Sequence, residues 1–144
     1  MTNLHNKNLL FVSKNLSDLS KGGREQLSRT NQMIIQDIFQ DNCFLFDTDP
    51  TKISSWGDKF NALKGFIDGL TIEKCYQVLE MIDEKNIDKV FVDGSNYGKL
   101  VQFLKNRNPN LEIISFFHNV EAKFFFDAFM KTKSLRSLFI LIAN

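Results

Sequence analysis

The amino-acid sequence predicts an α/β domain of the Rossmann-like or flavodoxin-like kind, with three layers built around a mostly parallel sheet. Four short apolar runs, rich in β-branched and aromatic residues, alternate with stretches of helical periodicity. Strands that alternate with helices in this way require crossover connections, which join parallel strands. The chain has 144 residues, of which 43% are hydrophobic, enough for one core. Residues 1–144 are therefore expected to form a single domain.

The first part of the chain contains two of the expected strands and one helix. Asn8–Lys14 is a short apolar run of the kind found in strands that are buried on both faces. A polar loop follows, and apolar residues at helical spacing then predict a helix from Arg24 to about Phe39. Cys43–Phe46 is the second expected strand. The apolar positions that define the helix are Leu27, Met33, Ile34, Ile38 and Phe39.

Two helices are expected before the third strand. The first is short, with apolar residues at Phe60, Leu63, Phe66 and Ile67, and it ends at Gly69. The second has Thr71 as its N-cap with Glu73 behind it, and it runs to about Lys85. Its inward-facing residues are expected to be Cys75, Val78, Leu79 and Ile82.

The last part of this region contains the third and fourth expected strands, with a helix between them. Lys89–Asp93 is the third expected strand, and a helix capped by Ser95 or Asn96 comes after it. Pro109 ends that helix, because a proline and the residue before it are unfavourable for helix. Leu111–Phe117 is the fourth strand.

Charge and cysteine content exclude several classes of function. The formal net charge of +1 and the pI of about 7.7 give no overall field that would attract nucleic acid, so no nucleic-acid partner is expected. Cys43 and Cys75 have neither CxxC spacing nor nearby histidines, which indicates reduced thiols and no zinc site. The chain begins without a signal-peptide pattern and has no apolar run of roughly 18 residues. A cytoplasmic protein, or one peripheral on the inner membrane face, is expected.

Ligands of parallel α/β sheets bind beyond the carboxyl ends of the strands, so the residues that follow each strand are the candidate site. Gly22 and Gly23 precede a helix N-terminus, where backbone N–H groups favour a phosphate, and Arg24 adds further donors. A flexible turn is the alternative explanation of the glycine pair. Neither GxGxxG nor GxxxxGK[ST] occurs, which disfavours a nicotinamide-dependent epimerase or reductase and a P-loop NTPase.

Two other loops at this edge contain polar side chains. Asp93, Ser95, Asn96 and Tyr97 in the DGSNYG loop suit the hydroxyl groups of a sugar, although a turn and a helix cap would use the same residues. His118 follows the last expected strand, where an imidazole can donate to a developing negative charge. A structural histidine is the alternative there. No second histidine or carboxylate cluster lies at ligand spacing, so no metal is expected.

Three segments resemble one enzyme family. FFHNVEAKFF, residues 116–125, is similar to the end of a core strand in the N-terminal domain of bacterial capsular-polysaccharide glycosyltransferases of the family 4 kind. KGGREQLSRTNQ resembles the glycine loop of that family, and VFVDGSNYGKLVQFLK resembles its next strand and helix. The three segments occur in the family's order and, together with the strand pattern, the resemblance covers nearly the whole chain.

The resemblance implies one half of a two-domain GT-B enzyme, in which a nucleotide-sugar lies between the domains and the N-terminal half holds the acceptor. It implies that Gly22 and Gly23 approach the donor diphosphate and that His118 contacts the donor sugar or its phosphate. Asn119, Glu121 and the DGSNYG loop would then line the acceptor side. Enzymes of this kind retain the anomeric configuration and use no bound metal, so no cofactor is implied beyond the nucleotide-sugar substrate.

One departure from the family pattern is large. The donor-binding half of the family has two glutamates with seven residues between them, and no Glu-x7-Glu pair occurs here. Groups that stabilise the leaving diphosphate are therefore expected in a C-terminal donor-binding domain, and this chain alone is expected to be inactive. The alternative is a non-catalytic Rossmann-like or flavodoxin-like binding or scaffolding module.

The chain from Val120 onward is expected to be helical and combines aromatic with basic residues. This composition is typical of a peripheral helix on an anionic membrane surface, as a lipid-linked acceptor would require. A core or domain interface is the alternative use of such aromatics. Leu138–Ala143 adds an apolar run that would leave an exposed patch, so self-association is expected. The membrane or interface residues are Lys123, Phe125, Phe129, Lys131, Lys133 and Arg136.

Overall fold

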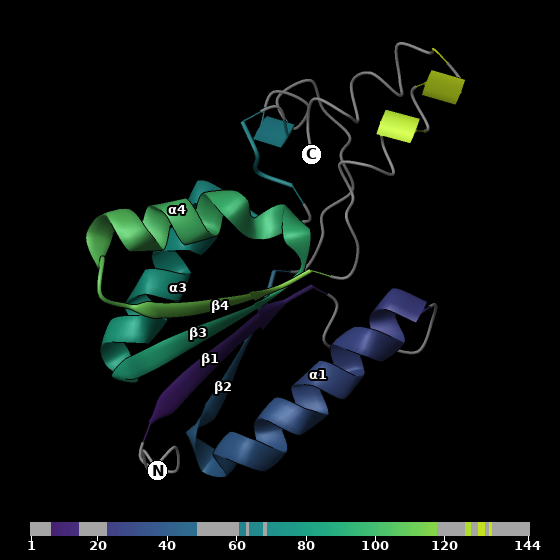
Figure 1. Ribbon diagram of the computed structural model, residues 1–144. Helices are drawn as coiled ribbons and strands as arrows, with labels where there is room; N and C mark the ends of the chain where they lie inside the picture. Colours follow the sequence, from purple (N-terminus) through teal and green to yellow (C-terminus); the bar gives the residue numbers. More distant parts are fainter. Residues whose placement is uncertain are drawn as a thin grey trace.

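The protein is a three-layer α/β domain with a parallel four-stranded sheet, as the sequence predicts (Figure 1). The computed structural model describes residues 7–14, 23–48, 61–62, 64–67, 69–117, 126–127, 130–131 and 133, without the side chain of Arg24. Helix α1 lies on one side of the sheet, and helices α3 and α4 lie on the other (Figure 1). The fold is Rossmann-like in its layers and in its parallel pairing.

All four expected strands are present. They are β1 (Asn8–Ser13), β2 (Cys43–Asp47), β3 (Ile87–Asp93) and β4 (Glu112–Phe116), and every pair of neighbours is parallel. Their order in the sheet is β2-β1-β3-β4. The two central strands are the most buried, since a strand with a helix layer on each face and a neighbour on each edge has little solvent-exposed surface.

The strand order explains the placement of the helices. Helix α1 (Gly23–Phe39) connects β1 to β2, while α3 (Ile72–Glu84) and α4 (Gly98–Arg107) precede and follow β3. The chain moves outward from β1 to β2 and then returns past β1 to β3. Because crossovers between parallel strands are right-handed, this reversal of direction puts α1 on the face opposite α3 and α4.

Two apolar clusters fill the spaces on either side of the sheet. The larger one lies between the sheet and α3 and α4, and includes Leu10, Val12, Val90 and Leu100. The smaller one lies under α1, where the rings of Phe11 and Phe91 stack with centroids 5.3 Å apart and planes 7° from parallel. Both rings belong to residues directly opposite each other in the β1–β3 register, so their stacking joins the central strands.

Local signals position α3 as the sequence predicts. Thr71 is the N-cap, and its side chain accepts a hydrogen bond from the Lys74 backbone N–H at 3.2 Å. Backbone hydrogen bonding, together with a contact to the Thr71 hydroxyl, lowers the pKa of Glu73 below its usual value. Gly69 has φ of 77°, so a glycine is favoured at the turn before the helix. Cys75, Val78 and Ile82 are buried.

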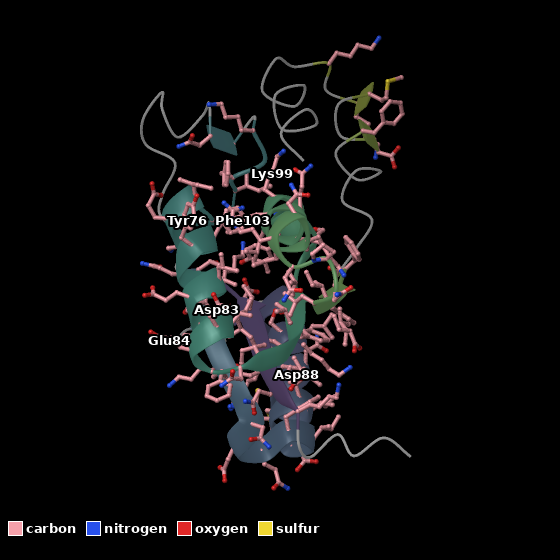
Figure 2. The ribbon with its side chains drawn as sticks, turned by 90° about the vertical axis from the view of Figure 1, so that its left-hand side faces the viewer. Tyr76, Asp83, Glu84, Asp88, Lys99 and Phe103 are labelled. Atoms are coloured by element: carbon pink, nitrogen blue, oxygen red, sulfur yellow. The ribbon has the colours of Figure 1, made fainter. Side chains whose placement is uncertain are left out.

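Helices α3 and α4 also contact each other through their side chains. The rings of Tyr76 and Phe103 meet edge to face with centroids 5.1 Å apart, and Figure 2 shows the two residues on adjacent helices. The Arg107 guanidinium lies 3.7 Å from the centroid of the Phe103 ring and donates a hydrogen bond to the Tyr76 hydroxyl at 3.2 Å. These contacts join α3 to α4 at the edge of the larger apolar cluster.

Helix α1 is present as predicted, but most of the apolar positions that predict it are not on its buried side. Phe39 is buried at 6% exposure, but the other predicted positions are between 38% and 61% exposed. The helix packs on the sheet through Ile35 and Phe39, and Ser28 is also buried. Apolar residues surround more of this helix than one narrow sheet can cover, so periodicity alone identified the helix and not its buried side. The exposed positions are Leu27, Met33, Ile34 and Ile38.

Two other details differ from expectation or lie outside the described residues. Ser95 and Asn96 do not cap α4 through their side chains; residues Ser95–Tyr97 form a 3₁₀ turn, and the N-cap residue is Tyr97. Of the short helix expected before Gly69, residues 61–62 are helical, whereas Phe60 and Leu63 lie outside the described residues.

Removal of a central ring is expected to be costly. Phe11→Ala should lower the free energy of unfolding by about 3–5 kcal/mol, because it removes a fully buried side chain and leaves a cavity beside Phe91. Urea denaturation measures the change. The control is Phe117→Ala, where the ring is 63% exposed and the expected loss is below about 0.5 kcal/mol. Equal losses for the two variants would contradict the packing described here.

The two cysteines are expected to be unreactive in the folded chain. Burial raises the pKa of both Cys43 and Cys75 to about 11, so little thiolate exists near pH 8. Iodoacetamide should modify the folded chain at least roughly tenfold more slowly than the urea-unfolded chain, whose thiols have pKa values of about 8.5.

The same shifts predict the sign of one pH effect. Above about pH 9 the unfolded thiols lose protons that the folded thiols retain up to about pH 11, so stability should fall as the pH rises through this interval. The control is the Cys43→Ala/Cys75→Ala variant, whose stability should fall less steeply there. An identical slope for both proteins would show that the thiols make no contribution.

Candidate ligand-binding site at the carboxyl edge of the sheet

The carboxyl ends of β1 and β3 form the point where the direction of the chain through the sheet reverses. The connection after β1 leads to one side of the sheet, and the connection after β3 leads to the other. In open parallel sheets this divergence is where ligands bind. Ser13 ends β1 and Asp93 ends β3, so these two residues mark the position in this chain.

Asp93 is hydrogen-bonded on both carboxylate oxygens. The Ser13 hydroxyl donates to Oδ2 at 3.2 Å, and the Asn31 side-chain amide donates to Oδ1 at 2.9 Å. Asp93 and Ser13 are each only 1% exposed. A buried carboxylate needs such partners, because removal from water without hydrogen bonds is costly. Asp93 thus joins the central strands to α1.

A second polar group lies on the opposite face of the sheet. The hydroxyls of Thr48 and Tyr97 are 2.8 Å apart, and both residues are buried. The backbone N–H of Thr48 donates to the Ser13 carbonyl at 2.9 Å, and the Lys74 ammonium donates to the Thr48 carbonyl. These bonds connect the end of β2 with α3 and with the turn that precedes α4.

The two polar groups hold the DGSNYG loop in place. Asp93 fixes its start and Tyr97 fixes its end, while the Gly94 N–H donates to the Phe116 carbonyl at 2.9 Å. Gly94 has φ of 140°, in the region that favours glycine. Asp93 and Tyr97 are therefore internal supports, and the loop presents Ser95 and Asn96 at the surface.

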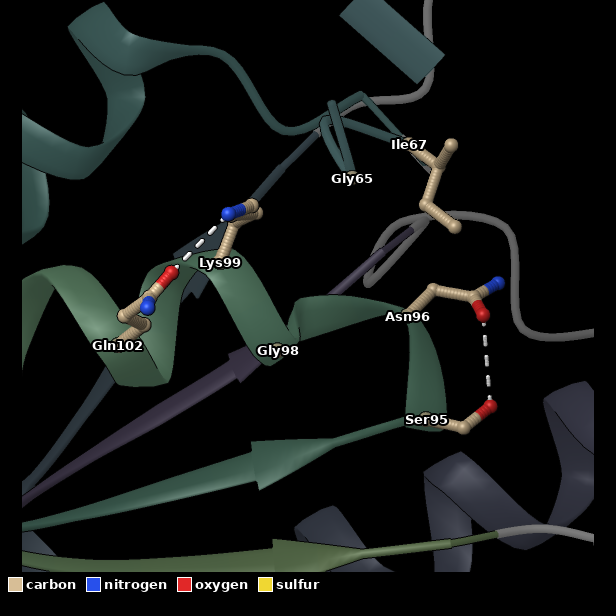
Figure 3. A pocket seen from close by; sticks show the side chains of 7 residues that line it. All are labelled: Gly65, Ile67, Ser95, Asn96, Gly98, Lys99 and Gln102. Carbon is tan, nitrogen blue, oxygen red and sulfur yellow. Dashed lines mark hydrogen bonds between the residues drawn. The ribbon is translucent and has the colours of Figure 1, made fainter. Parts of the chain in front are cut away.

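A pocket of about 450 Å³ opens beside this loop, between the start of α4 and the segment around residue 65 (Figure 3). Ser95 and Asn96 lie at one end of the pocket, while Lys99 and Gln102 lie at the other (Figure 3). The lining residues are Gly65, Ile67, Ser95, Asn96, Gly98, Lys99 and Gln102.

Two glycines determine the shape of the pocket. A Cβ atom on Gly65 would lie 2.8 Å from Cγ of Lys99, so the backbone here packs directly against the lysine stem. Gly65 also has φ of 86°, which disfavours any larger residue. Gly98 also lines the pocket, and a Cβ atom there would meet nothing within 4 Å.

The structure brings some of the predicted site residues together. Ser95 and Asn96 line the pocket, and their side chains are within 3.5 Å of each other. Gly23 begins α1, more than two helical turns before Asn31, which is about 12 Å along the axis. The predicted anion site at Gly23 is thus set well apart from the carboxylate of Asp93.

Most of the other predicted site residues lie outside the described residues. The donor-phosphate and catalytic candidates Gly22 and His118 lie outside the described residues, as does the side chain of Arg24. The acceptor candidates Asn119 and Glu121 also lie outside them. The same holds for the membrane or interface candidates Lys123, Phe125, Phe129 and Arg136.

Lys131 and Lys133, from the proposed membrane or interface stretch, are exposed. Nearby, Phe126 and Met130 are 51% and 52% exposed. No helix in the described part of the chain is both long enough and apolar enough to cross a bilayer. Within the same residues, no cluster of three or more His, Cys, Asp or Glu side chains is arranged to hold a metal ion. Cys43 and Cys75 are free thiols.

Several residues that shape this edge are not evident from the sequence. Ser13 ends β1 and Thr48 directly follows β2, so their positions at strand ends could have identified them as residues of this edge. Asn31 is an ordinary polar residue within a helix. Lys99 and Gln102 follow the DGSNYG loop at i, i+3 spacing, which puts them on one side of α4 and lets the Lys99 ammonium donate to Gln102 Oε1 at 3.0 Å.

The fold and this edge define a parallel α/β domain with a ligand-sized pocket next to its topological switch point. The chain matches no protein family, no curated protein and no solved structure, so a function must be inferred from the site itself.

The buried hydroxyl pair supports the loop and is open to a direct test. Tyr97→Phe should lower the free energy of unfolding by about 1 kcal/mol, because it leaves the buried Thr48 hydroxyl without this partner. The matched control is Tyr76→Phe, which removes a hydroxyl from an exposed contact with Arg107 and should cost less than about 0.5 kcal/mol. Urea denaturation of both variants measures the difference, and a larger cost at Tyr76 would contradict this interpretation.

Proposed function

We propose that this chain is the acceptor-side half of a GT-B glycosyltransferase in cell-surface polysaccharide synthesis. Such an enzyme moves a sugar from a nucleotide-sugar to a polysaccharide or lipid-linked acceptor. The observation that supports this proposal most is the pocket of about 450 Å³ beside the DGSNYG loop. Its volume is within the range of roughly 300–1,000 Å³ that is typical of small-molecule sites.

The chemistry of the lining suits a saccharide. Ser95 offers a hydroxyl, and Asn96 and Gln102 offer amides that both donate and accept hydrogen bonds. Sugar hydroxyls also donate and accept, so these groups complement them without a formal charge. Ile67 adds an apolar surface for the C–H groups of a ring. In the proposed enzyme this pocket holds the acceptor, while the donor contacts come mainly from a second domain.

Catalysis in this proposal needs groups beyond the pocket. His118 would contact the donor sugar or its phosphate, and Gly22 and Gly23 would approach the diphosphate, as the family resemblance implies. Stabilisation of the leaving diphosphate is the largest demand of the reaction, and the groups for it belong to the donor-binding half. The membrane-facing role of the aromatic and basic stretch is part of the same proposal, because a lipid-linked acceptor is presented at a membrane surface.

A second candidate function is a non-catalytic binding or scaffolding module. The observation in its favour is that Asp93, the only carboxylate in the DGSNYG loop, is buried and hydrogen-bonded to Ser13 and Asn31. A carboxylate held in this way stabilises the loop and is shielded from a bound sugar. A binding module requires only the pocket.

A genetic test separates the two functions. Gly98→Leu in the chromosomal gene should reduce cell-surface polysaccharide to the level of a gene deletion, because the new side chain occupies the pocket without a clash at its Cβ. The matched control, Arg29→Gln on α1, changes an exposed side chain on the other side of the sheet and should leave the polysaccharide unchanged. Chemical analysis of extracted polysaccharide measures the outcome. An unchanged deletion strain would contradict the glycosyltransferase and favour the module.

The half-enzyme proposal is tested separately in vitro. The purified 144-residue chain, supplied with UDP-glucose and a lipid extract, should form no labelled glycolipid or polysaccharide. Sugar transfer by this chain alone would contradict the proposal that a second domain provides the donor site.

A further inference from the structure

We infer that the pocket beside α4 binds a sugar with an anionic group, and that Lys99 recognises the negative charge. The inference rests on the proposed function only in identifying this sugar as the acceptor. Among the described residues that line the pocket, Lys99 is the only one with a charged side chain. A neutral ligand would require no cation at this position.

The position of the Lys99 side chain is restrained. Its stem packs against the backbone at Gly65, where even a Cβ atom would lie 2.8 Å from Cγ. Its ammonium donates to Gln102 Oε1 at 3.0 Å. An ammonium has three N–H donors, so this bond leaves others for a ligand. A surface lysine that is already restrained loses less conformational entropy when it binds an anion.

The Lys99 ammonium keeps its charge in the hydrogen bond that positions it. The partner of the ammonium is a neutral amide, so its charge is not cancelled by that contact. Figure 2 shows Lys99 in the upper part of the domain, while the labelled Asp83, Glu84 and Asp88 lie below it, away from the pocket. The attraction of an anion to Lys99 is therefore not offset by these carboxylates at short range.

The neutral hydrogen-bonding residues of the pocket favour a ligand that has polar groups in addition to its negative charge. Ser95, Asn96 and Gln102 supply neutral hydrogen-bonding groups on both sides of Gly98, where a Cβ atom would meet nothing within 4 Å. Figure 3 shows Lys99 and Gln102 at one end of the pocket and Ser95 and Asn96 at the other. A ligand that contacts both ends has an anionic substituent joined to a hydroxylated ring, as in a sugar phosphate or a uronic acid.

Titration of the ¹⁵N-labelled chain with four probes tests the inference. Glucose 1-phosphate and glucuronate should shift the backbone amide signals of Gly65, Gly98 and Lys99 saturably, and whichever binds more tightly identifies phosphate or carboxylate as the preferred anion. Neutral glucose and inorganic phosphate should each bind roughly tenfold more weakly, because each lacks one half of the contacts. Glucose or phosphate binding as tightly as both anionic sugars would overturn the inference.

Three variants sharpen the test. Lys99→Gln should weaken binding of the tighter anionic sugar roughly tenfold without changing that of glucose, whereas the control Arg29→Gln should change neither. Gly98→Ala should also weaken sugar binding, because its methyl group enters the pocket, but the melting temperature should not fall, since alanine favours helix. Anionic-sugar binding that is unaffected by Lys99→Gln would overturn the assignment of the charge.

The outcomes distinguish this inference from the proposed function. If anionic sugars bind through Lys99 but a deletion strain has unchanged polysaccharide, the glycosyltransferase proposal is contradicted and the assignment of the pocket still holds. If the deletion strain loses polysaccharide but neutral and anionic sugars bind equally well, the preference for an anionic sugar is contradicted and the proposed function still holds.

Discussion

The parallel pairing of β1 with β3 sets the positions of the helices and of the loops at the carboxyl edge of the sheet. These strands are adjacent in the sheet but far apart in the sequence, where β2 lies between them. Their pairing forces the chain to reverse direction, and the right-handed crossover rule then puts α1 on one face and α3 and α4 on the other. The stacked rings of Phe11 and Phe91 stabilise this pairing from the side of α1.

At the carboxyl edge of the sheet the apolar core ends and polar side chains begin. The same strand pairing buries some of these polar groups, which then need hydrogen-bond partners. On the α1 face Asp93 is hydrogen-bonded by Ser13 and Asn31, and on the other face Thr48 and Tyr97 are hydrogen-bonded to each other. These contacts satisfy buried polar groups and also fix both ends of the DGSNYG loop. The hydrogen bonds that satisfy the buried polar groups therefore also hold the loop, and this gives Ser95 and Asn96 defined positions.

The pocket arises where that rigid loop and the first turn of α4 meet a segment from an earlier part of the chain. Gly65 approaches Lys99 so closely that the lysine stem becomes part of the wall. A site built in this way combines a cation with neutral hydrogen-bonding groups within one cavity. This combination connects the proposed acceptor role to a sugar that has a negative charge.

Much of the fold is predictable from the sequence because the relevant signals are local. The four strands follow from short apolar runs, and the start of α3 follows from the capping preference of Thr71. Part of the site is also predictable, since residues that follow parallel strands must meet at one edge. Ser95 and Asn96 do lie at a pocket there. The prediction of side-chain caps from these two residues was wrong, because a 3₁₀ turn precedes the helix.

The alternation of strands and helices can be read from the sequence alone, because hydrophobic periodicity and capping act over a few residues. The buried side of α1, which leaves Met33 and Ile34 exposed, and the pairing of buried polar groups become visible only in the folded chain. The same is true of Lys99, which lines a pocket against Gly65. Burial and hydrogen bonding of this kind depend on contacts between segments distant in the chain, and such contacts have no local signature.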